Sequence, residues 1–370
     1  MSATTRFAVL GAALALVATS GSAALAQKKY DTGASDTEIK IGNIMPYSGP
    51  ASAYGIIGRT EAAYFKKIND AGGINGRKIN FISLDDSYAP PKTVEQTRRL
   101  VESDEVALIF SSIGTAHNTA IAKYLQGKNI PQLFLASGAS KFGDIAQFPQ
   151  ATMGVQAPFR YEARLYARYA LAKNPNARFA VISQNDDYGR DYLAGIKDVL
   201  GDKYDSLVTV ATYEISDPTI DSQIVQLKAA GVDTLIEQSS SKAAAQSIRK
   251  VYELGWKPLH VIGGSTASVE TILKPAGLEA SKGLVTTQFL KQPGDPAWAN
   301  DDEVKAYKDF LKTYAPSANP DDYSVLVAYM NVHAVEMALR KCGDDLTREN
   351  LIKQATSMKG ERLPMMLPGV

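Results

Sequence analysis

Cysteine and histidine are nearly absent from this chain of 370 residues. The sequence has one cysteine, Cys342, and three histidines, His117, His260 and His333. A single cysteine excludes an intramolecular disulfide, and no cysteine stands near the N-terminus, where a lipid anchor would need one. No two histidines have the short spacing that zinc ligands use, so we expect no metal site.

Neither sign of charge is in excess. Lys+Arg 40 against Asp+Glu 39 leaves a formal net charge of +1. A protein that binds nucleic acid needs a basic surplus to neutralise phosphates, so nucleic acid is not an expected partner. The hydrophobic content of 45% and the 28 glycines are typical of a globular α/β protein, and the length suits two domains of that kind.

The motifs of nucleotide-binding and hydrolytic enzymes are missing as well. The turn at 42–49 lacks the glycine fingerprint of dinucleotide-binding proteins, and no Walker lysine motif occurs. Ser239 and Lys242 share the Ser-x-x-Lys spacing of penicillin-recognising enzymes, but the companion motifs are absent. Asp85 and Asp86 end a predicted strand, where carboxylates commonly cap the chain. Because no nucleophile and base can be paired, we predict that the protein is not an enzyme and needs no cofactor.

The first 26 residues have the pattern of an export signal. Arg6 supplies the positive charge, residues 7–18 form an apolar run, and residues 24–26 form a small-residue cleavage site. The apolar run is too short to span a bilayer comfortably. We therefore expect residues 1–26 to be a cleaved signal peptide and residues 27–37 to be a flexible leader. The mature protein is then expected in the periplasm, without a lipid anchor.

From residue 38 onwards, apolar strands alternate with amphipathic helices. An apolar run within 38–49 is followed by a helical period that ends at Gly73, and then by a second strand at 79–84. The same order recurs in two series, which end near residue 140 and residue 262. Two such series predict an α/β protein with two similar doubly wound parallel sheets, each with helices on both faces.

The two series define two expected lobes. The first comprises residues 38–154 plus 286–340, and the second comprises residues 155–285 plus 341–370. Helices late in the chain are expected to cross back to the first lobe and return, so that three crossings, the last near residue 340, make a multi-strand hinge. Two lobes joined in this way can rotate about a few backbone torsions while each core stays packed.

Small polar loops follow the predicted strands in both series. They lie at 111–115, 137–140, 186–189, 239–241 and 265–268. A loop that opens a helix offers free backbone N–H groups and the positive end of the helix dipole, so the first two loops, on neighbouring strands, suit one carboxylate. Ordinary helix capping is the better explanation for any single serine in them, and the hypothesis of a ligand site depends on the recurrence of such loops in both series.

Three tyrosines, Tyr54, Tyr88 and Tyr188, lie in the same kind of loop. A tyrosine there supplies a flat apolar wall that carries a hydroxyl group. The alternative is that each tyrosine only anchors its own loop.

Several motifs together resemble the periplasmic leucine/isoleucine/valine-binding protein family. They are Ile39-Lys-Ile-Gly42, Ser48-Gly-Pro50, Ala53-Tyr-Gly55, Ala71-Gly-Gly-Ile-Asn-Gly76, Asp85-Asp86, Asp187-Tyr-Gly189, Gly283-Leu284 and the helix around Tyr329, spread over nearly all of the mature chain. The resemblance implies a type I periplasmic binding fold, in which two Rossmann-like lobes close on a small-molecule ligand. It also implies a monomer that delivers this ligand to an ABC transporter permease in the inner membrane.

The resemblance also implies which residues line the ligand site. From the first lobe these are Tyr54, Tyr88, Ser112, Gly114, Thr115, Ser137, Gly138 and Ala139, and from the second they are Tyr188, Ser240 and Gly264. The chain departs from the amino-acid binders of the family at several of these positions. Ala139 stands where they place a threonine hydroxyl, Gly264 where they place the acid that pairs with the ammonium group, and Ser240 where they place a wall tyrosine. Tyr88 stands where they often have a disulfide cysteine.

These departures bear on the ligand. A zwitterionic amino acid buried in a closed cleft needs an acceptor for its ammonium group, because an unpaired buried charge costs several kcal/mol. Neither Gly264 nor Ala139 has an accepting side chain. We therefore predict a small organic acid, preferably an aromatic one such as a benzoate or a phenylpropenoate. Glu237 and Asp186 are the carboxylates that would restore a branched-chain or other amino acid as ligand, and a ligand-sensing input protein is the alternative function.

Overall fold

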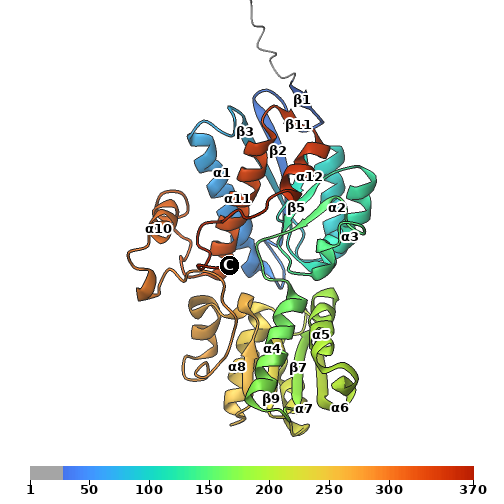
Figure 1. The fold of residues 1–370 in the computed structure, drawn as a ribbon, viewed down its shortest axis with the longest axis vertical. Coiled ribbons are helices and arrows are strands. Elements are labelled where there is room, and N and C mark those ends of the chain that lie inside the picture. Colours follow the sequence, from blue (N-terminus) through green and yellow to red (C-terminus); the bar gives the residue numbers. More distant parts are fainter. Residues whose placement is uncertain (1–27) are drawn as a thin grey trace, which may run out of the picture.

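The computed structural model describes residues 28–370, which form two lobes, each built around a parallel sheet (Figure 1). We call residues 29–153 and 290–366 lobe 1 and residues 159–285 lobe 2. The sheet of lobe 1 has the order β3 (Lys78–Asp85), β2 (Glu38–Met45), β4 (Leu108–Phe110), β5 (Gln132–Leu135), β6 (Ala151–Met153). The sheet of lobe 2 has the order β10 (Leu259–Ile262), β9 (Thr234–Gln238), β7 (Phe179–Gln184), β8 (Val208–Tyr213). The predicted α/β architecture with two doubly wound sheets is confirmed.

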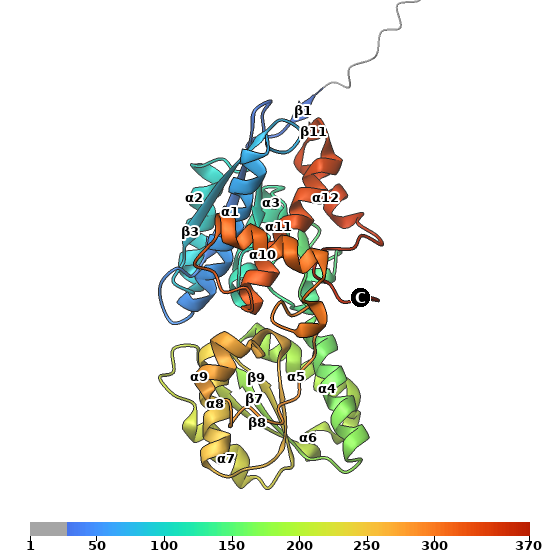
Figure 2. The ribbon, with the colours of Figure 1, turned by 90° about the vertical axis from the view of Figure 1, so that its left-hand side faces the viewer.

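Helices cover both faces of each sheet (Figures 1 and 2). Lobe 1 has α1 (Ile56–Asp70), α2 (Pro90–Glu102), α3 (Thr115–Gly127), α10 (Asp302–Tyr314), α11 (Tyr323–Cys342) and α12 (Arg348–Thr356). Lobe 2 has α4 (Phe159–Lys173), α5 (Asp187–Leu200), α6 (Tyr204–Leu207), α7 (Asp221–Ala229), α8 (Ser241–Glu253) and α9 (Lys274–Ala276). A turn of π-helix at Val269–Leu273, which the sequence analysis did not predict, precedes α9.

The central strands are buried on both sides, which explains why they are apolar throughout. In lobe 1, Ile41 and Leu108 face the cluster formed with α1 and α11, while Ile44 and Ile109 face the cluster formed with α2 and α3. Each of these side chains contributes about 1.5–3 kcal/mol by leaving water. Parallel strands connected by helices require this double cover, so the continuous apolar runs of the sequence correctly indicated their position.

The C-terminal residues pack on lobe 1. Strand β11 (Asp345–Leu346) pairs in parallel with β1 (Lys29–Tyr30), and Leu351, Leu363 and Met365 belong to the apolar cluster around α1 and α11. The prediction that residues 341–370 belong to the second lobe, with a third crossing near residue 340, is therefore wrong. The reason is that α11 runs for 20 residues inside lobe 1 and carries the chain away from the cleft.

Contacts with the C-terminal part of the chain also hold the N-terminal stretch in place. Arg77, only 2% exposed, donates from Nη2 to the Tyr30 hydroxyl and to Asp344 Oδ1, both at 2.6 Å. Residues 28–37 are thus held against the C-terminal part of the chain, and the prediction of a flexible leader is wrong for them. The signal peptide predicted for residues 1–26 lies outside the described residues.

Two stretches connect the lobes, at 154–158 and 286–289. Gly154 begins the first, and it lies so close to Leu135 that an added Cβ would be 2.3 Å from the Leu135 carbonyl oxygen. The second lies between Val285, which bridges to β10, and Leu290, which bridges antiparallel to Met366. Both stretches overlap the places where the sequence analysis expected a hinge, and the hinge motion itself stays a prediction.

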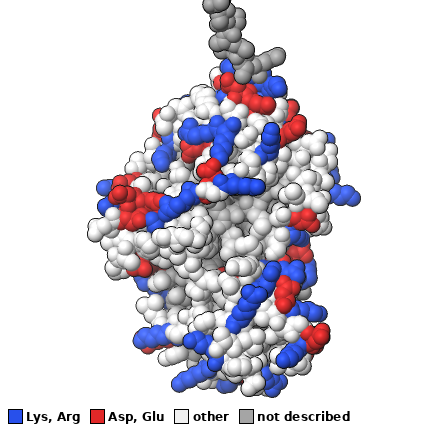
Figure 3. All heavy atoms as spheres, viewed as in Figure 1, with Lys and Arg blue, Asp and Glu red and all other residues white. Residues whose placement is uncertain are grey.

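The surface is evenly charged. Figure 3 shows Lys and Arg side chains mixed with Asp and Glu over one face of the molecule, in agreement with the net charge of +1. None of the helices within residues 28–370 has the length and apolar character that crossing a bilayer requires.

Cys342 ends α11 in the core of lobe 1, and burial raises the pKa of its thiol to about 12. The thiol therefore stays protonated at neutral pH and reacts slowly. We expect the folded protein to resist modification by a thiol reagent until denaturant is added, and its melting temperature to be unchanged by dithiothreitol. Rapid modification of the native protein, or a shift of several degrees, would contradict this.

Candidate functional site

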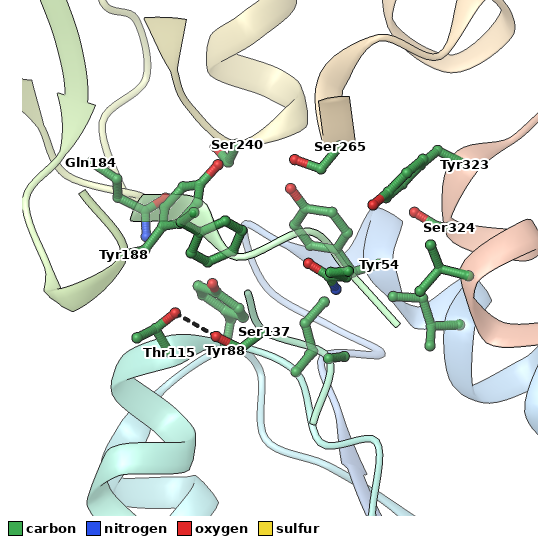
Figure 4. A pocket seen from close by; sticks show the side chains of 17 residues that line it. Tyr54, Tyr88, Thr115, Ser137, Gln184, Tyr188, Ser240, Ser265, Tyr323 and Ser324 are labelled. Carbon is green, nitrogen blue, oxygen red and sulfur yellow. Dashed lines mark hydrogen bonds between the residues drawn. The ribbon is translucent and has the colours of Figure 1, made fainter. Parts of the chain in front are cut away.

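A cavity of about 70 Å³ lies between the lobes (Figure 4). Its walls come from loops and helix starts at the carboxyl ends of the strands, the place where open parallel sheets hold ligands. The lining residues from lobe 1 and the first crossing are Tyr54, Ile57, Tyr88, Ile113, Gly114, Thr115, Ala136, Ser137, Gln156, Tyr323, Ser324 and Val327, and those from lobe 2 are Phe159, Gln184, Tyr188, Ser240 and Ser265.

Most of the residues predicted for the site line this cavity. They are Tyr54, Tyr88, Gly114, Thr115, Ser137, Tyr188 and Ser240. Their side chains converge from both lobes in Figure 4. The structure therefore brings the predicted loops together, and their role in binding a ligand stays a prediction.

Ser112 and Ala139 do not line the cavity. The Ser112 side chain is buried, and its hydroxyl has no hydrogen-bond partner among the described residues. Ala139 belongs to an apolar cluster with Phe142 and Phe159, which continues from lobe 1 into lobe 2. Both positions support the loops behind the cavity wall.

Gly138 lies behind the wall for a steric reason. A Cβ at this position would lie 2.5 Å from the Ala157 carbonyl oxygen and 2.8 Å from the ring of Phe159. Only a glycine lets this loop approach the first crossing so closely.

Gly264 borders a smaller cavity of about 10 Å³, which shares Gln156 and Phe159 with the first. Its N–H donates to Glu162 Oε1 at 2.9 Å, and this oxygen lies 3.0 Å from where a Cβ at position 264 would be. Glu162 of α4 therefore places a carboxylate close to position 264, where amino-acid binders of the family are expected to carry an acidic side chain.

The carboxylate of Glu162 already accepts several hydrogen bonds within the protein. Oε1 accepts from the N–H of Gly264 at 2.9 Å, from Thr287 Oγ1 and from the Tyr166 hydroxyl at 2.9 Å, while Oε2 accepts from the Tyr192 hydroxyl at 2.6 Å. Most of its about four lone-pair sites are therefore used within the protein, and Glu162 does not line the larger cavity.

The two other carboxylates considered for an ammonium group are also occupied. Glu237 accepts from Ser239 Oγ at 2.7 Å and lies 2.9 Å from His260 Nε2, while Asp186 accepts from the N–H of Tyr188 at 2.9 Å as the N-cap of α5. Neither lines the cavity, and no charged side chain does. Among residues 28–370, no group of acidic, histidine and cysteine side chains could hold a metal ion.

One wall of the cavity offers hydrogen-bond donors at the start of α3. The N–H groups of residues 115, 116 and 117 have no acceptor among the described residues, because α3 begins at Thr115 after Gly114 as N-cap. The hydroxyl groups of Thr115 and Ser137 lie 2.8 Å apart beside them (Figure 4). Free N–H groups, two hydroxyls and the positive helix end suit an anion.

The opposite walls are aromatic. Phe159 and Tyr188 pack edge to face with ring centroids 4.7 Å apart, and Tyr54, Tyr88 and Tyr323 complete the enclosure. Burial raises the pKa of Tyr54, Tyr88 and Tyr188, so their hydroxyls remain neutral. The cavity thus presents neutral flat surfaces with a few hydroxyl groups.

Sequence reasoning missed several lining residues that lie next to the crossings. They are Gln156, Phe159, Tyr323 and Ser324. Phe159 and Tyr323 are the first residues of α4 and α11, and each follows a cap or proline that begins the helix. An aromatic residue at the first position of a helix beside a crossing was the available signal.

Polar contacts join the lobes around the cavity. The N–H of Ser241 in lobe 2 donates to the Tyr54 hydroxyl in lobe 1 at 3.3 Å, and Lys141 Nζ lies 2.6 Å from Asp187 Oδ2 at one edge. Further contacts across that edge join Thr119 with Asp187 and Ser140 with Asp191. The structure is therefore a closed conformation.

The ion pair at this edge gives a test of closure. Burial opposes ionisation of Asp187, but bonds from Lys141 and Arg190 outweigh it and lower its pKa to about 2. The pair is therefore complete above about pH 4 and is lost as the pH falls through about 2. Because it is partly exposed, we expect Lys141→Ala to shift the ligand-free equilibrium towards the open form by about 1 kcal/mol or less.

Small-angle scattering at neutral pH should then give a larger radius of gyration for Lys141→Ala than for the unmodified protein. Lys282→Ala is the matched control, since Lys282 pairs with Glu279 within lobe 2 and both side chains are 72% exposed. Equal values for all three proteins would mean that this pair does not influence closure.

Comparison with known proteins places the chain among binding proteins. The sequence model of the family described as periplasmic binding protein matches residues 38–368. Leu/Ile/Val-binding protein homolog 1 of Brucella abortus is 28% identical over 342 residues, which cover 89% of this chain and 84% of that protein. Homolog 7 of the same species is 24% identical over 263 residues, covering 68% and 66%.

Solved structures share the fold. A fatty acid ABC transporter substrate-binding protein from Thermomonospora curvata superposes with a TM-score of 0.78 at 21% identity, covering 92% of this chain and 85% of that one. A branched-chain amino acid ABC transporter from Thermus thermophilus with bound valine gives 0.75 at 16% identity, covering 88% and 84%. At these identities the likeness concerns the fold alone.

Proposed function

The chain belongs to the periplasmic binding protein family, and on that premise we propose that it is the solute-binding protein of an ABC importer of the branched-chain-amino-acid type. In this proposal residues 1–26 direct export to the periplasm. The monomeric mature protein captures its ligand between the lobes and delivers it to the permease in the inner membrane. The ligand is a small organic carboxylate, preferably an aromatic one.

The absence of any charged side chain from the cavity lining carries the proposal for the ligand. A carboxylate can be held without a cation by the free N–H groups at the start of α3 and by Thr115 and Ser137, because hydrogen bonds to a charged acceptor are stronger than neutral ones. An amino acid, such as the valine named for the Thermus thermophilus protein, would bury its ammonium group in a cavity that no carboxylate lines.

The aromatic walls support a flat ligand. An apolar cavity of about 150 Å³ accepts benzene. The present volume of about 70 Å³ is about half of that, so the cavity has to widen before it can hold a benzoate. A fatty acid, named for the Thermomonospora curvata protein, would require a much larger rearrangement of the tyrosine walls.

Isothermal titration calorimetry with two ligand panels tests the proposal. Benzoate and phenylpropenoates are expected to bind, and leucine, isoleucine and valine are expected to bind much more weakly. Submicromolar leucine binding with no response to any aromatic acid would refute the proposed ligand class. Ligand-dependent association with membrane vesicles that contain the permease would test the transport role separately.

A variant of Thr115 tests whether the cavity wall at the start of α3 binds the carboxylate. We expect Thr115→Val to weaken benzoate binding by about tenfold or more, because a hydrogen bond to a charged group contributes about 1.5–3 kcal/mol. Thr313→Val is the matched control, since its exposed hydroxyl donates to the Asp309 carbonyl on α10, away from the cavity. Equal affinities for both variants would place the carboxylate elsewhere.

A further inference from the structure

His117 is a buried histidine whose side chain has no hydrogen bond. It is 2% exposed, and among the described residues neither ring nitrogen has a partner. The two other histidines are bonded: His333 to Tyr64 and Tyr329, and His260 to Glu237. A buried polar group without a partner is unusual and calls for an explanation.

The imidazole lies directly behind the cavity wall at the start of α3, which is proposed to bind the carboxylate. His117 is the third residue of α3, so its own N–H is one of the free donors at the start of that helix. Its ring packs on Tyr88 with centroids 4.1 Å apart, and its Nδ1 lies 2.3 Å from where a Cβ at Gly114 would be. Tyr88 and Gly114 both line the cavity, so one layer of atoms separates the imidazole from it.

The groups around the ring are acidic. Asp86 and Tyr88 face it from the loop before α2, and Asp186 faces it from the cap of α5 across the cleft. Burial lowers the pKa of His117, while the carboxylate of Asp86, the backbone of Tyr88 and the carboxylate of Asp186 act in the opposite direction. The ring is therefore neutral at physiological pH, although a positive charge there would be partly compensated.

We propose that His117 takes up one proton from solvent when a carboxylate binds at the start of α3, so that ligand capture tightens as the pH falls. This inference rests on the proposed carboxylate ligand. The bound anion adds a third negative charge near the ring, where the cavity lining supplies no cation. The imidazolium that forms compensates this charge without touching the ligand, so His117 acts as a positioning residue.

The sign of the pH effect follows from linkage. The ligand raises the pKa of His117, so the bound protein holds more protons than the free protein between the two pKa values. Affinity therefore rises as the pH is lowered through that interval, by up to tenfold per pH unit. Benzoate itself stays ionised in this range.

Calorimetry with benzoate at about pH 8 and about pH 6, in two buffers of different ionisation enthalpy, tests the inference. We expect about tenfold tighter binding at the lower pH and net proton uptake that accounts for it. His117→Gln is expected to bind with an affinity that does not depend on pH. His333→Gln, which changes a half-buried histidine in lobe 1 whose pKa burial also lowers, is expected to keep the dependence of the unmodified protein.

Failures of the two proposals are distinguishable. If benzoate binds with the same affinity at both pH values and without proton uptake, the role of His117 is overturned and the carboxylate ligand stands. If benzoate and the other aromatic acids do not bind at either pH, both are overturned. If His117→Gln does not fold, the two-buffer measurement on the unmodified protein still distinguishes these outcomes.

Discussion

Replacing Glu162 by alanine is expected to lower the melting temperature by about 10 °C. The substitution leaves buried donors on Tyr192, Thr287 and Gly264 without their acceptor, and each such donor costs about 1–3 kcal/mol. The sum is about 4 kcal/mol or more, and each kcal/mol corresponds to about 2–4 °C for a folding unit of roughly 150–250 residues, somewhat larger than lobe 2. The donors come from α5, the second crossing and the loop after β10, so the substitution loosens lobe 2 where it meets the crossing.

Thermal unfolding followed by circular dichroism measures this effect. Glu279→Ala is the matched control, because Glu279 is 72% exposed and pairs only with Lys282 three residues later. An exposed pair of this kind contributes about 1 kcal/mol or less. A Glu162→Ala protein that melts within one degree of the Glu279→Ala protein would show that the buried carboxylate does not stabilise lobe 2.

Gly189→Ala is expected to cost about 3 kcal/mol and to weaken ligand binding. A Cβ at Gly189 would lie 2.0 Å from the Gln184 carbonyl oxygen and 2.2 Å from Ser183 Oγ, so α5 would have to move away from β7. Gln184 and Tyr188, which flank this contact, both line the cavity. The glycine of the Asp-Tyr-Gly motif is thus required for close packing of helix against strand.

The control for this substitution is Gly127→Ala, at the last residue of α3. No atom lies within 4 Å of a Cβ there, and the backbone has no positive φ. Alanine at such a position is expected to stabilise by about 0.4–1 kcal/mol. Denaturant titration and benzoate calorimetry of both variants test the expectation, and a Gly189→Ala protein as stable as Gly127→Ala would contradict it.

The regular part of the fold was predictable because its physical cause is local in the sequence. The strand predicted for residues 79–84 agrees with β3, and the helical period predicted to end at Gly73 agrees with α1, which ends at Asp70. The helical period indicates burial of one face and the continuous apolar runs indicate burial of two, and an α/β architecture with two doubly wound sheets follows from their order. The comparisons confirm that fold and the family.

The terminal segments were not predictable by the same means. Strands β1 and β11 have two residues each, too few to show a period. The helix α12 has an apolar face, but that face does not indicate which lobe covers it. Residues 341–370 were therefore assigned to the wrong lobe.

The candidate site was predictable only in part, because it is made of loops from both lobes. Loops after strands identified Thr115, Ser137 and Tyr188. The residues beside the crossings were missed, since they lie in a connecting stretch and at helix starts, not in loops after strands. Glu162 was missed for a different reason: it reaches Gly264 from 102 positions earlier in the sequence, and no local pattern relates the two.

Lobe 2 interrupts lobe 1 in the sequence, and this order has a consequence for folding. Residues 159–285 form a continuous unit that is complete before α11 has been synthesised. The core of lobe 1, by contrast, joins Ile41 and Phe110 to Val325 and Leu339, so it must wait for the end of the chain. Contacts between such distant residues form slowly. Lobe 1 therefore completes its core only when synthesis of the chain is nearly finished, whereas the segment of lobe 2 is available earlier.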